Sequence, residues 1–531
     1  MRIGQLLQLL GLGLILIPLN LPLCRGQLAP DATLTTVGAA YGTTDINSCS
    51  VDLNNLVTAT VGGTTYQFVA YYDNSGDINI ARRSLGSSTW TDLDTNINIV
   101  TPTDGDVTAA SLLGDDHNTI AMAVDSTGDL NMSFGMHNVS LNYDISNASV
   151  MGSTGSFLST TFTAQTSSNS PVLINSTTSN EATYPDFYNI PGSSDLLFAY
   201  RNGGSGGGSG NGDEYFNVYD PVAKTWTNTL VINGEKTSVN AYLNNLVYAP
   251  NGQLEMSWTW RATPNWQTNS NIMYAQSSNN GTSWSGLGGA DPYTLPIIQS
   301  GNPRQSDGQV VQTIPEGDSF INQTSMTADA SSNPIIATYY APGWNATSAT
   351  AGSGNPNRQY MLVYYDGTKW RTSQISDRTS DTAVDYSGDD VRDLGRPIVV
   401  VDKQGRVLVV TRSEDTAMGS YSNPATPNND LVVYYNTVSS LDSATPAAWQ
   451  SLTLDTTNMG ELEPTYDAAL WNGFNELDLM FEPVGFSGEG TATLQVLDWN
   501  EQAYFASLPE PGSLGILAIG ATALLRRRRL K

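Results

Sequence analysis

Two histidines, His117 and His137, are the only ones in the 531-residue chain, and they lie 20 residues apart. They stand in the segments 115–118 (Asp-Asp-His-Asn) and 135–138 (Gly-Met-His-Asn). Histidine is the usual general acid or base near neutral pH, because its ordinary pKa is close to that range. The pair therefore indicates proton transfer, although two hydrogen-bonded surface histidines without a catalytic role would give the same pattern.

A tyrosine and an arginine follow soon after the histidines. Tyr184 lies in the segment Thr-Tyr-Pro-Asp-Phe (183–187), and Arg201 ends an apolar run just before the Gly- and Ser-rich segment 203–212. A tyrosine hydroxyl can donate or accept a proton, and an arginine fork can pair with a carboxylate at two points. Tyr184 as a core residue and Arg201 as the cap of a strand edge are the alternatives. The glycine segment has no Lys-Ser or Lys-Thr after it, so it is not a phosphate-binding P-loop.

The elements that must position these residues are strands. Short alternating runs rich in Val, Ile, Tyr and Thr recur between clusters of Asn, Asp, Gly and Ser, and no amphipathic helical stretch of useful length interrupts them. We count seven such units at intervals of roughly 40 to 80 residues. Most of them close on a tryptophan: Trp90, Trp226, Trp284, Trp370, Trp449 and Trp499.

A single small sheet of this kind cannot bury both of its faces, so neighbouring sheets must stack and the ring must close. The sequence therefore predicts an all-β fold over residues 30–505, a seven-bladed β-propeller of four-stranded antiparallel blades, with six or eight blades as alternatives. One unit contains Ser-Ser-Asn-Asn-Gly-Thr-Ser-Trp (277–284), which resembles the Asp-box turn of bacterial neuraminidase repeats. That turn is structural and supports the architecture without indicating chemistry.

The two ends of the chain have the character of sorting signals. Arg2 precedes an apolar run from Leu6 to Leu23, and residues 1–29 are expected to be a secretory signal peptide, with a membrane anchor as the alternative. At the other end, Pro-Glu-Pro-Gly (509–512), a short apolar stretch and four arginines resemble a PEP-CTERM sorting tail, 507–531. The resemblance implies export to the cell surface or extracellular matrix of a Gram-negative bacterium. It also implies recognition by a membrane-bound sorting enzyme, with transient membrane contact through the tail.

Charge and cysteine content exclude several partners and cofactors. Without the two ends, 16 basic residues stand against 49 acidic ones, a net charge near −33, and nucleic acid is therefore not expected as a partner. Cys24 and Cys49 are the only cysteines, so neither a disulfide framework nor a cysteine-based metal site is expected. The many Asp and Asn residues leave room for a structural calcium ion, but no segment has the spacing that would locate one. No other cofactor is expected, and we expect a monomer.

Taken together, the segments around His117, His137, Tyr184 and Arg201 resemble the neuraminidase-repeat family that includes the seven-bladed ulvan lyases. Further matches are Trp-Thr-Trp-Arg (258–261) and Gly-Arg-Pro (395–397). The resemblance spans roughly residues 60 to 450. It implies cleavage of an acidic polysaccharide by β-elimination, with these four as catalytic residues. Other residues in these matching segments are candidate substrate ligands: Asn118, Asn202, Trp260, Arg261 and Arg396.

In that chemistry Arg201 would neutralise a uronate carboxylate and so acidify the neighbouring C5 proton. The assignment of base and acid among His117, His137 and Tyr184 stays open. The main alternative is a non-catalytic propeller that binds glycans or proteins at the cell surface or in the matrix. A glycoside hydrolase would need two carboxylates about 5 to 9 Å apart, which so acidic a chain could supply. A sialidase is disfavoured because no arginine triad is recognisable.

Overall fold

The computed structural model describes residues 28–42, 46–48, 54–99, 112–115, 117–165, 181–205, 211–234, 239–299, 308–343, 357–378, 394–412, 430–456, 463–482 and 491–508. Both cysteines lie outside the described residues, as do nearly all of the expected signal peptide and sorting tail. Within the described residues, no helix is long and apolar enough to cross a membrane.

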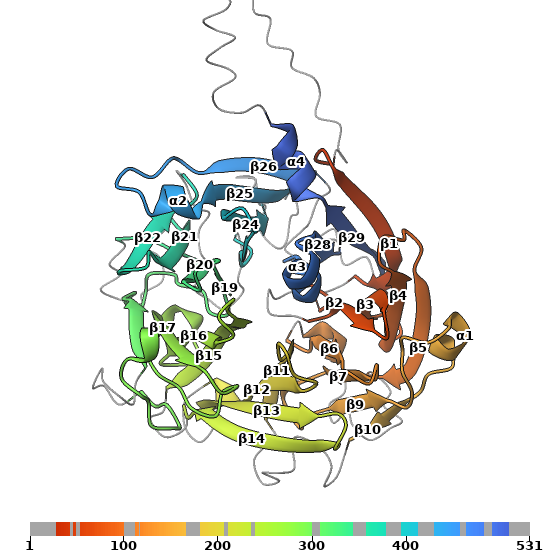
Figure 1. The fold of residues 1–531 in the computed structure, drawn as a ribbon. Coiled ribbons are helices and arrows are strands. Elements are labelled where there is room, and N and C mark those ends of the chain that lie inside the picture. The colour runs from red at the N-terminus through yellow and green to blue at the C-terminus, as the bar shows by residue number, and fades with distance from the viewer. Residues whose placement is uncertain are drawn as a thin grey trace, which may run out of the picture.

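Seven antiparallel sheets stand around a central axis, which confirms the seven-bladed propeller (Figure 1). Blade 1 contains β2 (Leu56–Val61), β3 (Thr64–Tyr72), β4 (Asp77–Ser84) and β5 (Thr91–Asn98). Blade 2 contains β6 (Ile120–Val124), β7 (Leu130–Phe134), β9 (Tyr143–Ser146) and β10 (Phe162–Ala164). Blade 3 contains β11 (Ala182–Asn189), β12 (Leu196–Ser205), β13 (Asn211–Asp220) and β14 (Thr225–Ile232).

The second half of the ring repeats this plan. Blade 4 contains β15 (Asn240–Tyr248), β16 (Leu254–Arg261), β17 (Asn269–Ser277) and β18 (Gln309–Gln312). Blade 5 contains β19 (Ser325–Ala328), β20 (Pro334–Tyr340), β21 (Gln359–Tyr365) and β22 (Trp370–Gln374). Blade 6 contains β23 (Ile398–Val401), β24 (Arg406–Arg412), β25 (Leu431–Thr437) and β26 (Gln450–Asp455). Blade 7 contains β27 (Thr465–Tyr466), β28 (Leu477–Phe481), β29 (Thr491–Trp499) and β1 (Ala32–Tyr41).

Helices are short and lie between or after the strands. They are α1 (Thr154–Leu158), α2 (Val438–Leu441), α3 (Ala468–Phe474) and α4 (Glu501–Ser507), with 3-10 turns η1 (Leu112–Gly114), η4 (Trp266–Thr268) and η5 (Leu287–Gly289). The core is divided among the interfaces between neighbouring blades. Phe68 and Ile80 of blade 1, for example, pack in one cluster with Met122 and Met132 of blade 2. Inner strands are therefore covered on both faces, and all five residues of β6 are buried.

The first strand of the chain closes the ring, a pairing that the sequence reading did not anticipate. β1 pairs antiparallel with β29, so the two ends of the described chain share blade 7 (Figure 1). Arg83 of β4 reinforces this closure, because its guanidinium lies 3.1 Å from Asp478 of β28 and also pairs with Asp498 of β29. Closure by strand pairing leaves the ring without an open end.

The Asp-box-like segment of blade 4 forms the expected turn. Asn279 accepts a hydrogen bond from the Ser283 backbone N–H at 2.9 Å, and Trp284 donates to the Gly281 carbonyl at 2.9 Å. Gly281 has φ +85°, a conformation that favours glycine. Trp284 is buried and packs edge-on against Phe216 of blade 3, so this motif contributes to blade packing.

A candidate active site on one face of the propeller

The four candidate catalytic residues all come to one face of the ring. His117 lies just before the inner strand β6, and Tyr184 lies near the start of the inner strand β11. Arg201 and Arg261 lie near the ends of the second strands β12 and β16, which run antiparallel to the inner strands. Because the two strands are antiparallel, the start of the inner strand and the end of the second strand of a blade lie at the same face of the ring. The fold therefore gathers side chains from blades 2, 3 and 4.

His137 reaches this site through an unusual strand. β8 (His137–Val139) lies in the connection between β7 and β9 of blade 2, yet it pairs with β11 and adds a fifth strand to the sheet of blade 3. His137 stands opposite Thr183, and the Asn138 N–H donates to the Thr183 hydroxyl at 3.0 Å. This short ladder fixes His137 beside Thr183, the residue that precedes Tyr184.

A bulge in β11 presents Tyr184 to the site. Thr183 pairs with Arg201 and Asp186 pairs with Ala199, so two residues of β11 stand opposite the single Tyr200. Tyr184 has φ +55°, which is rare for a bulky residue and costs about 1 to 3 kcal/mol. Such backbone strain clusters at functional sites, where the surrounding structure holds it in place.

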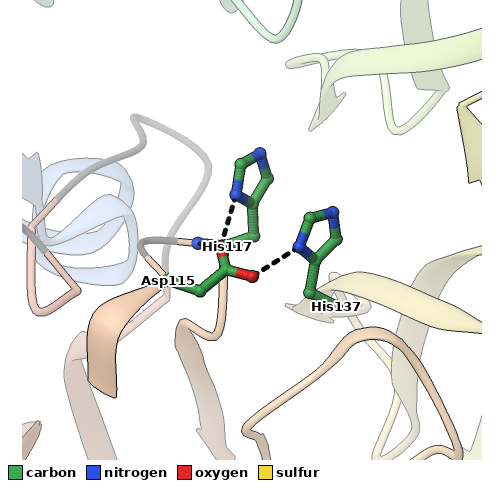
Figure 2. Close-up of side chains that lie close together, drawn as sticks. All are labelled: Asp115, His117 and His137. Carbon is green, nitrogen blue, oxygen red and sulfur yellow. Dashed lines mark hydrogen bonds and ion pairs between the residues drawn. The ribbon is translucent and has the colours of Figure 1, made fainter. Parts of the chain in front are cut away.

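The two histidine rings stack and share one carboxylate, Asp115 (Figure 2). Their centroids are 4.1 Å apart and their planes differ by 11°. His117 Nδ1 lies 2.8 Å from Asp115 Oδ1, and His137 Nδ1 lies 2.6 Å from Asp115 Oδ2. Burial alone would raise the pKa of Asp115, but the hydrogen bonds from both histidines hold it well below its usual range. Asp115 is therefore ionised throughout the neutral range.

Aromatic rings connect the histidines to two arginines. Tyr184 lies 5.9 Å from the His117 ring and 6.2 Å from the Tyr242 ring, centroid to centroid. The Arg201 and Arg261 guanidinium carbons lie 4.5 Å and 5.1 Å from the Tyr242 centroid, within cation–π range. Burial raises the pKa of Tyr184, and Tyr242 adds to this, whereas Arg201 and the other nearby arginines oppose it. The hydroxyl therefore keeps its proton at neutral pH.

Arg201 is held firmly from behind. Its Nη2 donates to the Gly204 carbonyl at 2.6 Å and to Asn240 Oδ1 at 3.1 Å. Gly212 passes so close that a Cβ atom there would lie 1.9 Å from Arg201 Nε, so only glycine fits at this position. The glycine-rich segment that the sequence reading singled out thus ends at a residue that makes room for the arginine.

A buried acid, Glu214, stands opposite Arg201 in the ladder between β12 and β13. Burial raises the pKa of the Glu214 carboxyl to about 8, although Arg201 lowers it in part. Glu214 is then largely neutral at pH 7, which leaves the charge of Arg201 available to a bound anion. A small cavity behind Tyr184 and Arg201 is lined by Glu214, Asn244 and Thr119 among others. One side-chain atom of each of these three has no hydrogen-bond partner among the described residues, so the cavity is polar enough to hold water.

The candidate substrate ligands differ from one another in their burial and in the contacts that they make. Arg261 is half-buried and donates from Nη1 to the Tyr242 hydroxyl at 3.2 Å. Arg396 makes a two-point ion pair with Glu463, 3.1 Å to each oxygen, and still acts electrostatically on Tyr184. Asn118 is fully buried and braces the turn at Asp115, and Asn202 accepts from the Glu181 N–H at 3.4 Å. These two amides shape the backbone around the site.

Trp260 differs most from its expected role. It is 1% exposed and packs edge-on against Trp258 in the core between blades 3 and 4. A side chain buried in this way offers no ring face to a sugar, because the alternation of β16 directs it into the interface between blades. Conversely, sequence reasoning missed Asp115, Tyr242 and Glu214. Asp115 lies in the segment 115–118 together with His117, whereas no motif in the sequence indicates Tyr242 or Glu214.

The Asp115, His117 and His137 side chains bring three ligand-type atoms within 4.8 Å of one another, so a metal ion has to be considered. The stacked rings make this a poor cage. A nitrogen lone pair lies in the plane of its ring, and two stacked, nearly parallel rings with centroids 4.1 Å apart do not direct their lone pairs at one ion about 2.0 to 2.1 Å away. Both Nδ1 atoms are also engaged by the carboxylate. The arrangement suits the handling of protons.

Comparison with known proteins agrees with this fold. The BNR repeat-containing family matches residues 66–378, more than half of the chain. The chain belongs to this family. Among curated proteins, none matches the sequence of this BNR-repeat protein.

Solved structures with the same fold include polysaccharide lyases. The polysaccharide lyase Uly1 is 14% identical, with a TM-score of 0.52 over 88% of this BNR-repeat protein and 100% of the lyase chain. An ulvan lyase of family PL25 is 12% identical, with a TM-score of 0.58 over 87% and 95% of the two chains. A structure of a PL25 ulvan lyase bound to -[GlcA(1-4)Rha3S]- gives a TM-score of 0.57 at 12% identity and the same coverage. Identities this low establish the common fold alone.

Proposed function

We propose that this protein is a polysaccharide lyase that cleaves a uronic-acid-containing, ulvan-like polymer by β-elimination. The observation that carries the proposal is the meeting of four kinds of group at one face. They are two stacked histidines, the carboxylate that both histidines contact, a strained tyrosine, and two arginines on the ring of Tyr242. The related fold of two lyases, one of them bound to a glucuronate-containing oligosaccharide, adds support.

The elimination requires three actions, and the site has a group for each. Arg201 pairs with the uronate carboxylate and withdraws charge from it, which acidifies the C5 proton. A base removes that proton, a C4–C5 double bond forms, and the C4–O4 bond breaks with its electron pair on O4. An acid then gives a proton to O4, so the proton count balances. His117, His137 and Tyr184 are the candidates for base and acid, and the raised pKa of Tyr184 favours it as a donor.

An acidic polymer must approach a propeller whose net charge is near −33 once both ends of the chain are removed. Arg201 and Arg261 provide the local positive charge, and salt screens the remaining surface beyond about 8 Å at physiological ionic strength. We therefore propose that activity rises from low to moderate salt and falls again when the arginine contacts are themselves screened. No metal is required by this scheme, so we expect activity to withstand a chelator.

The signals at the ends fit an extracellular substrate. We propose that residues 1–29 direct export and that the tail 507–531 is read by a membrane-bound sorting enzyme, which leaves the propeller at the surface or in the matrix. Mass spectrometry of the protein recovered from a Gram-negative host tests this. Loss of both segments from the mature chain is the expected result, and an intact tail would contradict it.

The direct test is the ultraviolet absorbance of the unsaturated uronate while the propeller is incubated with ulvan and other uronate polymers. We expect a rise on at least one polymer that is lost in His117→Ala and in Arg201→Ala. Arg371→Ala is the matched control, because Arg371 pairs with Asp366 at the turn after β21, away from the site. A folded protein that gives no rise on any uronate polymer would refute the lyase. Polymer binding without a rise would then favour the glycan-binding alternative.

A further inference from the structure

Asp115 contacts both histidines and has no assigned role in the proposed reaction. Its two carboxylate oxygens are divided between the rings, Oδ1 facing His117 Nδ1 and Oδ2 facing His137 Nδ1. A backbone turn holds it in place, since the His117 N–H donates to Oδ1 at 3.1 Å and the Asn118 N–H donates to the Asp115 carbonyl at 3.2 Å. The carboxylate is thus aimed by the segment just before β6.

An ionised carboxylate only accepts hydrogen bonds, so each facing Nδ1 must carry a proton. In a neutral ring with its proton on Nδ1, the other nitrogen, Nε2, is bare and can accept a proton. Both Nε2 atoms lie on the side of the rings away from Asp115 (Figure 2). One acid therefore sets the tautomer of both histidines and turns both reactive nitrogens in the same direction.

We propose that Asp115 is a positioning residue that fixes His117 and His137 as Nδ1–H tautomers, so that both histidines exchange protons with substrate through Nε2. The tautomer assignment does not depend on the proposed lyase function, whereas its consequence for catalysis rests on that function.

The test uses the fact that the chain has only two histidines. Ring ¹⁵N-labelling of the tag-free protein gives two imidazole signal sets, and ¹⁵N shifts distinguish a protonated Nδ1 from a protonated Nε2. We expect Nδ1–H for the neutral form of both rings in the wild type. An Nε2–H tautomer on either ring would overturn the inference, whatever the activity of the protein.

Asp115→Asn is the matching variant, because an amide offers one acceptor and one donor where the carboxylate offers two acceptors. We expect one ring to keep Nδ1–H and the other to change to Nε2–H. Asp94→Asn, at an exposed position of β5, should leave both signal sets unchanged. Unchanged tautomers in Asp115→Asn would also overturn the inference. If Asp115→Asn fails to fold, Asp115→Glu keeps the carboxylate and is expected to keep both Nδ1–H tautomers.

Activity gives a second readout that separates the two proposals. If the wild type cleaves a uronate polymer, Asp115→Asn should lower kcat about 10²- to 10⁴-fold, as a wrong histidine tautomer does in other enzymes, with little change in KM. A fully active Asp115→Asn would refute the positioning role. If the wild type shows the expected tautomers but cleaves nothing, the lyase function fails and the tautomer assignment stands.

Discussion

His137 stands opposite Thr183 in the ladder between β8 and β11, although the two residues belong to different blades. On its other side Thr183 pairs with Arg201 of β12. One threonine thus fixes the lateral order of a histidine from blade 2 and an arginine from blade 3, and the bulge that follows it presents Tyr184 between them. The site therefore depends on strand register at a single position.

Gly212→Ala should disable Arg201 without unfolding the propeller. A Cβ atom at this position would lie 1.9 Å from Nε and 2.5 Å from Cζ of Arg201, so the guanidinium has to leave its place over Tyr242. Because a displacement of this size commonly costs about 10²-fold in rate, we expect a comparable loss of kcat/KM on a uronate polymer. Gly473→Ala in α3 is the control, since its Cβ would meet nothing within 4 Å. Equal activity of the two variants would show that Arg201 is not the clamp.

The blades were predictable because each is a local pattern. Alternating strands, turns and a closing tryptophan recur within one unit, and these decide which residues form a blade. Phe68 and Trp284 are examples that lie where such patterns place them, in the interfaces between blades. The pairing of β1 with β29 was not predictable in this way, because it joins residues at opposite ends of the chain and follows only from closure of the ring.

The candidate site was likewise predictable in one part and unpredictable in another. His117, His137, Tyr184 and Arg201 were identified by type and motif, and the fold brings them to one face. The residues that support these four side chains were harder to predict, because strand register and the packing of neighbouring blades bring them to the site. Glu214 stands opposite Arg201 in the ladder, and Tyr242 lies in the next blade. Trp260 was predicted to contact substrate, but it lies in the core because of how its strand is buried. In β16 both faces are buried, so an aromatic residue near the strand end enters the core.

Arg83→Met should destabilise the ring closure while leaving the site intact. The Arg83 side chain is 2% exposed and pairs with Asp478, itself buried, so its removal leaves a buried acid without its cation. Burial raises the pKa of Asp478 and Arg83 lowers it, so the loss of Arg83 makes the ionised form of this acid costlier still. Breaking a buried pair in this way typically costs about 3 to 5 kcal/mol. The free energy of unfolding from urea titration measures the loss. Asp478→Asn added to Arg83→Met should recover part of it, and a single variant as stable as the wild type would rule out this contribution to closure.

Tyr184→Phe should lower kcat by about 10²-fold or more with KM nearly unchanged, because the ring keeps its packing and only the proton-bearing oxygen is lost. Burial raises the pKa of this hydroxyl, which favours its protonated form in the working range. Steady-state kinetics on a uronate polymer measure the effect. Tyr188→Phe, four residues further along β11 on the wall of the same cavity, serves as the comparison. A Tyr184→Phe enzyme within threefold of the wild type would remove Tyr184 from the list of acids and bases.

Glu214→Gln should stabilise the protein at neutral and alkaline pH and extend activity to higher pH. The Glu214 pKa is about 8 in the folded protein against an ordinary value of 4.5, so the folded state binds the proton more tightly than the unfolded state. The stability that this provides is fully present below pH 4.5 and is lost as the pH rises through about 8. At pH 7 the burial of this acid therefore costs on the order of 3 kcal/mol relative to acidic conditions.

The same proton controls the charge beside Arg201. Above about pH 8 the Glu214 carboxylate would compete with a substrate carboxylate for the guanidinium, so wild-type activity should fall there. The glutamine variant keeps a neutral group of the same shape and should hold its activity one to two pH units longer. Urea titrations at pH 5 and 9, together with a pH–rate profile, test both effects. Glu501→Gln is the matched control, because burial raises its pKa to about 7 but it lies in α4 beside Arg406, far along the chain from the site. If the alkaline limb of the pH–rate profile shifts equally in both variants, the cause is general stability, and the charge beside Arg201 is not responsible.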